Sequence, residues 1–203
     1  MKRELSIIPI LHTSADMGQL ADGLRAHVGE EAWQRKQRAV DAWWDGIERW
    51  AGSQLDDAQR MTLYQDGLPD DPNAEAIVRD LADQGSRNHV VLARLMDAGA
   101  ALVGTEDPQL LVREYEIARQ TTEALSAGRE PDPRFAQRSE ALLRRRDMYI
   151  ASRIDDTLGG DRHGVLFIGA LHDPARFLPE NVTPSYPLGD PARDATITGA
   201  IER

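Results

Sequence analysis

Apolar residues of the 203-residue chain gather in short runs that alternate with longer stretches of helical period. Short apolar runs bounded by polar or turn residues are typical of buried strands. Four runs fit this description and a fifth fits it more weakly: 5–11, 61–64, 100–103, 165–171 and, as the weaker one, 182–186. We therefore expect an α/β domain with a central, mostly parallel or mixed sheet of four to five strands flanked by long helices.

The stretches between these runs predict five helices, over residues 30–51, 73–84, 86–98, 108–127 and 135–158. The first helix carries all four tryptophans on one stripe, which favours a core-facing helix. A homodimer interface through helix 30–51, or an aromatic wall for a substrate, is the alternative. In the last helix Arg146 and Asp147 lie on or beside the apolar stripe. They should face the interior, either as a buried pair or as charges that serve a site.

Composition narrows the class of protein. The formal net charge of −10 disfavours nucleic acid and anionic membranes as partners. The chain has no cysteine, and no apolar run approaches the length of a membrane helix or the pattern of a secretory signal. We expect a cytoplasmic protein with one domain over residues 1–188 and a polar tail over 189–203. The segment 128–134, rich in Gly and Pro, is expected to be a connector or a short lid.

Polar residues follow the apolar runs where each predicted strand ends: His12, Asp66 with Gln65 before it, Glu106 and His172. Parallel strands would bring these residues to one edge of the sheet, where α/β proteins bind ligands. Two histidines and a carboxylate suit a divalent metal such as Zn, Mn or Co, which activates water. Without a metal, a histidine beside a carboxylate can act as the general base. Each residue also has a plainer explanation, as a hydrogen-bonded strand end, a turn or a helix start.

A family resemblance adds to this interpretation. The sequence Gly-Ala-Leu-His at 169–172 fits the Gly-x-x-His motif of the TraB/GumN family, which includes the Tiki metalloproteases and is grouped with erythromycin esterases and ChaN-like proteins. The sequence Pro-Ile-Leu-His at 9–12 resembles the family's first motif with Pro in place of Gly, and Glu106 and Arg146 match in order. Over residues 5–187, the resemblance implies a hydrolase of peptide or ester bonds.

Together these observations predict a metal-dependent site with specific roles. His12, Glu106 and His172 would hold the metal or activate water directly, and Asp66 or Gln65 would orient the water or the substrate. Arg146 would stabilise an oxyanion or hold a carboxylate of the substrate. The substrate would be a peptide or another small molecule. The alternatives are a non-catalytic haem- or metal-binding protein of the ChaN-like type and a protein–protein module that works through its tryptophan helix.

Overall fold

The structure is a computed structural model that describes residues 2–11, 25, 29–126, 128, 130, 132 and 134–189. These described residues form one five-stranded sheet in the order β3-β2-β4-β1-β5, with every neighbouring pair parallel. The strands are β1 (Arg3–Ile10), β2 (Met61–Pro69), β3 (Ala101–Glu106), β4 (His163–Gly169) and β5 (Val182–Ser185). The predicted α/β class is confirmed, and the sheet is entirely parallel.

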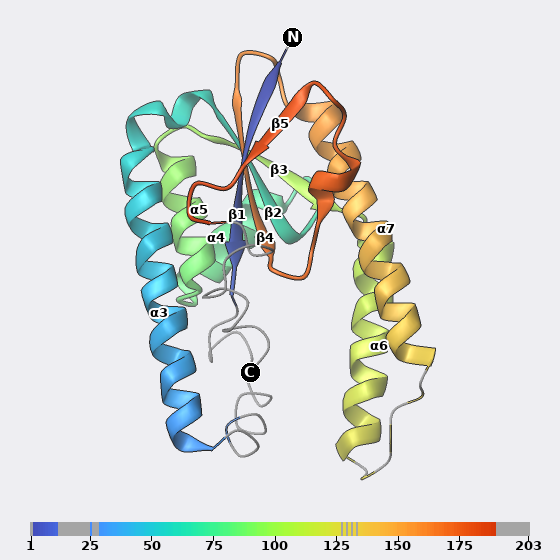
Figure 1. The fold of residues 1–203 in the computed structure, drawn as a ribbon. Helices are drawn as coiled ribbons and strands as arrows, with labels where there is room; N and C mark the ends of the chain where they lie inside the picture. The colour runs from blue at the N-terminus through green and yellow to red at the C-terminus, as the bar shows by residue number, and fades with distance from the viewer. Residues whose placement is uncertain are drawn as a thin grey trace.

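Helices cover both faces of the sheet (Figure 1). On one face lie α3 (Glu30–Ser53), α4 (Ala74–Asp83) and α5 (Arg87–Asp97), and on the other lie α6 (Pro108–Ser126) and α7 (Arg134–Thr157). Short 3₁₀ helices span Leu55–Arg60 and Pro174–Phe177. From β1 the chain passes to β2 and then to β3 at one edge of the sheet, and it then runs in the other direction to β4 and β5. Because crossovers between parallel strands have the same hand, the helices of these two directions lie on opposite faces. Within the described ranges no helix is long and apolar enough to cross a membrane.

A hydrophobic core lies on each face. The core under α3, α4 and α5 includes Ile8, Trp44, Leu63, Leu92 and Phe167. The core under α7 includes Leu5, Tyr64, Ile150, Ile154 and Leu166. The sequence pattern predicts Leu143 on the apolar stripe of α7, but the buried stripe begins at Leu142. Leu143 is half-buried and lines a cleft.

The tryptophan helix packs on the sheet. Trp33 and Trp44 are buried, whereas Trp43 and Trp50 are half-buried. The indole N–H groups of Trp43 and Trp44 donate to the carbonyl oxygens of Pro9 and Leu11 at 2.8 and 2.9 Å. Two indoles thus bind the end of β1 within the chain. The homodimer through this helix stays a prediction.

A bulge in β2 shapes the carboxyl edge of the sheet. Gln65 pairs with Gly104 and Pro69 pairs with Glu106, so three residues of β2 stand opposite a single residue of β3. Only glycine fits at position 104, because a Cβ there would lie 2.1 Å from the carbonyl oxygen of Pro69. The Thr105 hydroxyl donates to the carbonyl oxygen of Gln65 and closes the bulge. Bulges of this kind re-aim side chains, and this one carries Asp66.

Candidate functional site

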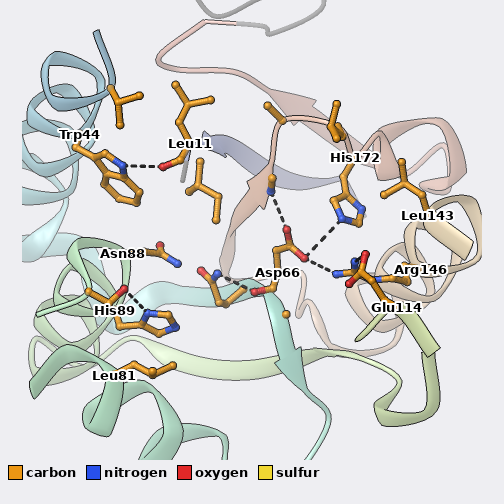
Figure 2. Close-up of a pocket in the computed structure, with 18 of the residues that line it drawn as sticks. Leu11, Trp44, Asp66, Leu81, Asn88, His89, Glu114, Leu143, Arg146 and His172 are labelled. Atoms are coloured by element: carbon orange, nitrogen blue, oxygen red, sulfur yellow. Dashed lines mark hydrogen bonds and ion pairs between the residues drawn. The ribbon is translucent and has the colours of Figure 1, made fainter. Parts of the chain in front are cut away.

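A cleft of about 860 Å³ opens at the carboxyl edge of the sheet. Its walls come from the ends of β1, β2 and β4, from α3 and α5 on one side, and from α6 and α7 on the other. Figure 2 shows Asp66 and His172 in the middle, with Arg146 and Glu114 on one side and Asn88 and His89 on the other. In open α/β sheets, ligands bind outside the carboxyl ends of the strands. The cleft also falls within the size range of small-molecule sites.

Arg146 connects three carboxylates at one end of this cleft. It lies four residues before Ile150 on the buried stripe of α7, so its side chain points at the sheet. Its Nη2 donates to Asp66 Oδ1 and to Glu106 Oε1, each at 2.6 Å. Its Nη1 donates to Glu114 Oε1 at 2.6 Å, and its Nε lies 3.2 Å from both Glu106 oxygens. Each guanidinium nitrogen therefore binds a carboxylate of the chain itself.

His172 is held between two carboxylates. Its Nδ1 lies 2.5 Å from Asp147 Oδ1, and its Nε2 lies 3.6 Å from Asp66 Oδ1. The other Asp147 oxygen accepts the backbone N–H of Asp173 at 3.1 Å, which fixes the carboxylate. Burial by itself lowers the pKa of His172, but the hydrogen bond with Asp147 and the charge of Asp66 outweigh it. The pKa of His172 therefore lies above its usual 6.5.

Asp66 lies at the centre of the cluster. Besides Arg146 and His172, it contacts the backbone N–H of Gly169, which donates to Oδ2 at 2.9 Å. Burial raises the pKa of Asp66, but the charges of His172 and Arg146 more than offset this, and its pKa lies below the usual 3.8. A Cβ on Gly169 would stand 2.9 Å from the same Oδ2. The glycine that opens the Gly-x-x-His sequence thus lets Asp66 reach the backbone.

Glu106 is fully buried at the end of β3. Burial raises the pKa of Glu106 above its usual 4.5, although Arg146 acts against this. Both carboxylate oxygens face the guanidinium, and a metal ion at this position would be repelled by Arg146. In the described part of the chain, no three His, Asp or Glu side chains form a group that could hold a metal. His12, the third expected ligand, lies outside the described residues, so the metal site stays a prediction.

The structure brings four of the expected site residues together, namely Asp66, Glu106, Arg146 and His172. Arg146 and Asp147 do face the interior, but they bind different partners. The sequence interpretation missed Glu114, which follows the buried Leu110 by one helical turn on α6.

The wall of α5 was also missed. The sequence predicts a surface position for His89, yet this residue is half-buried and lines the cleft, where its Nδ1 lies 2.8 Å from the Ser86 hydroxyl. Asn88 is buried beside it. Asn88 precedes the buried Val91 and Leu92 at helical spacing, and a polar residue on that stripe was the available signal.

Comparison with known proteins assigns no family to this chain. No protein-family model matches it, and neither does any curated protein or solved structure. The resemblance to the TraB/GumN family therefore stays a prediction, and the geometry of the cleft is the basis for a functional proposal.

Proposed function

We propose that the chain is a hydrolase that acts on a peptide or ester bond and uses His172 to transfer the proton. The observation that carries the proposal is the position of this imidazole, 2.5 Å from Asp147 on one nitrogen and 3.6 Å from Asp66 on the other. A histidine oriented by one carboxylate and facing a cleft with its second nitrogen has the arrangement that general acid–base catalysis needs.

The reaction follows from the protonation of this ring. In the neutral tautomer favoured by Asp147, Nδ1–H donates to that carboxylate, and the Nε2 lone pair lies on the side of Asp66, which lines the cleft. Nε2 takes a proton from water while the water oxygen bonds to the carbonyl carbon. The imidazolium then returns the proton to the leaving nitrogen or oxygen as the scissile bond breaks. Asp147 and Asp66 stabilise the imidazolium between the two steps.

Arg146 is a positioning residue in this proposal. The sequence interpretation expected it to bind an oxyanion or a carboxylate of the substrate, but its nitrogens already bind Asp66, Glu106 and Glu114. Its charge instead keeps two buried carboxylates together and holds Asp66 next to His172.

The proposal is tested by assaying the purified full chain against fluorogenic peptide amides and against esters of the same acyl groups. We expect His172→Gln to lower kcat/KM by about 10²–10⁴, the usual contribution of a general acid–base. Asp147→Asn should lower it less, because the imidazole remains. His163→Gln is the matched control, since this histidine lies at the opposite edge of the sheet.

Two results would overturn the proposal: no hydrolysis of any amide or ester, or full activity in His172→Gln. A chelator separates the two chemical routes. Activity that survives dialysis against a chelator supports direct catalysis by His172. Activity lost with the chelator and restored by Zn, Mn or Co supports the metal-dependent site predicted from the sequence.

A further inference from the structure

Two buried amide oxygens line the same cleft without partners. Among the described residues, three buried side-chain atoms lack a hydrogen-bond partner, and two of them are Gln65 Oε1 and Asn88 Oδ1. The two residues are only 2% and 7% exposed, and both line the cleft. A buried acceptor left unpaired costs about 1–3 kcal/mol. Two such groups in the wall of one cleft point to a ligand that supplies hydrogens.

The two amides lie on the opposite side of the cleft from Arg146. Gln65 precedes Asp66 on β2, and neighbouring strand residues point to opposite faces. The preceding residue on the same face, Leu63, belongs to the core under α3 and α5, and Asn88 is on α5 itself. Figure 2 shows Asn88 across the cleft from Arg146. A ligand that reaches these amides would therefore extend away from His172 along the cleft.

The hydrogen-bonding groups in this wall indicate which kind of ligand it binds. The Gln65 amide nitrogen donates to the carbonyl oxygen of Asp66 at 2.8 Å, so the side-chain oxygen is fixed as the unpaired acceptor. The Asn88 side-chain oxygen is likewise buried without a partner among the described residues. The same cleft is also lined by Val40, Trp44 and Lys36. Apolar lining residues and a lysine disfavour an ammonium donor and favour a neutral donor such as an amide N–H.

We propose that Gln65 and Asn88 form a subsite that binds amide N–H groups, so that the molecule bound in the cleft is a peptide rather than a simple ester. The identification of this peptide as the substrate rests on the proposed hydrolase function, whereas the subsite itself does not. One amide N–H that reaches a buried acceptor should strengthen binding roughly five- to tenfold.

The test compares two probes that differ in one N–H group: N-acetyl-leucine N-methylamide and N-acetyl-leucine methyl ester. Their dissociation constants are measured on the full chain by NMR, which also shows whether each probe stays intact. We expect the wild type to bind the amide roughly five- to tenfold more tightly than the ester. The double variant Gln65→Met/Asn88→Leu should bring this ratio close to one. One of the two single variants should do so alone, since the N–H that differs can reach only one of the two acceptors. Gln84→Met is the control, because Gln84 lines the cleft but is exposed.

Asn88→Leu should fold, because it replaces an unpaired buried acceptor by an apolar group of similar size. Gln65→Met removes an unpaired acceptor too, but it also removes the hydrogen bond from the amide nitrogen to the carbonyl oxygen of Asp66. If Gln65→Met does not fold, Gln65→Leu takes its place in the single and double variants. Equal binding of the two probes by the wild type, a preference that survives in the folded double variant, or no binding of either probe would overturn the subsite. If the amide preference is found but no substrate is hydrolysed, the subsite stands and the hydrolase proposal fails. Hydrolysis that depends on His172 without an amide preference supports the hydrolase proposal and overturns the subsite.

Discussion

The two edges of the sheet each hold a buried arginine and a histidine, but their partners differ. At the amino edge, Arg3 donates to the carbonyl oxygens of Asp155 and Leu158 at 2.7 and 3.3 Å, where α7 ends. At the carboxyl edge, Arg146 binds only side-chain carboxylates among the described residues. Carbonyls at a helix end lack partners within the helix, so Arg3 supplies what the backbone needs. Arg146 has no such structural task.

The histidines differ in the same way. His163 at the amino edge lies 2.9 Å from the Ser6 hydroxyl, and its nearest carboxylate, Glu4, is exposed and 3.6 Å away. His172 lies between two carboxylates that are both largely buried. A buried charge alone therefore does not mark a functional site in this protein. The distinguishing feature is a set of buried ionic groups that bind one another around a cleft.

The largest expected effect comes from removing the buried cation at each edge. We expect Arg146→Met to lower the free energy of unfolding by about 3–5 kcal/mol, because it leaves two carboxylates buried without their counter-charge. Arg3→Met should cost less, about 1–3 kcal/mol, because it leaves mainly neutral carbonyls unpaired. Urea unfolding of the two variants beside the wild type measures both values.

A double variant checks the cause. Because Glu106 is the most buried partner of Arg146, adding Glu106→Gln to Arg146→Met should recover part of the lost stability. An Arg146→Met variant that loses no more stability than Arg3→Met would show that the two edges are energetically alike.

The second effect concerns Asp147 and pH. We expect Asp147→Asn to cost about 1–3 kcal/mol at pH 6, because the charged ring then faces at best a neutral acceptor in place of a carboxylate. The pKa of His172 is raised in the folded protein, so its contribution to stability is fully present below the unfolded pKa of about 6.5. That contribution disappears as the pH rises through the folded pKa.

Unfolding curves at several values between pH 6 and pH 9 should therefore show this loss in the wild type. The loss should be smaller in Asp147→Asn and absent in His172→Gln. An NMR titration of the His172 ring should report a lower pKa in Asp147→Asn. An unchanged pKa would show that Asp147 does not hold the proton on this ring.

Much of the fold follows from local patterns. Runs and helical periods predicted every strand and long helix of the described residues, because burial on both faces of a parallel sheet requires continuous apolar strands. The strand predicted over 61–64 in fact continues to Pro69. The polar residues at its end resemble a turn in the sequence. They can continue the strand because Gly104 on β3 has no Cβ, which leaves room for the backbone of Pro69.

The residues of the candidate site were predictable from the sequence to a similar extent. Asp66, Glu106 and His172 follow from strand direction, and Arg146 follows from its position on the stripe of α7. The sequence does not predict which acid pairs with which cation, because any of several acids could bind Arg146 or His172. The choice of partner depends on how α6, α7 and the bulge of β2 pack against one another. Glu114 was not predicted for this reason, since the position of its helix across the cleft is set by tertiary packing. The burial of Asn88 could be inferred from its place on the apolar stripe of α5, but its position in the cleft wall could not.

The third effect tests the glycine that brings Asp66 to the backbone. We expect Gly169→Ala to cost about 1–2 kcal/mol, because the new Cβ would stand 2.9 Å from Asp66 Oδ2 and force the carboxylate away. The control is Gly46→Ala within α3, where a Cβ meets nothing within 4 Å. That change should stabilise the protein by about 0.5–1 kcal/mol, since alanine favours helix. Equal effects of both substitutions in urea unfolding would show that the close approach of Gly169 to Asp66 does not matter for stability.

The smallest effect compares the outer ion pairs of the two edges. Glu114 binds Arg146 and Asp155 binds Arg3, and the acid side chains are 46% and 48% exposed. Water screens both pairs equally, so Glu114→Gln and Asp155→Asn should each change the free energy of unfolding by about 0–1 kcal/mol. A clearly larger cost for Glu114→Gln in urea unfolding would show that the outer acid also supports the buried cluster. Equal small costs would show that the difference in stability between the two edges comes from the buried partners of Arg146, beside the cleft and His172.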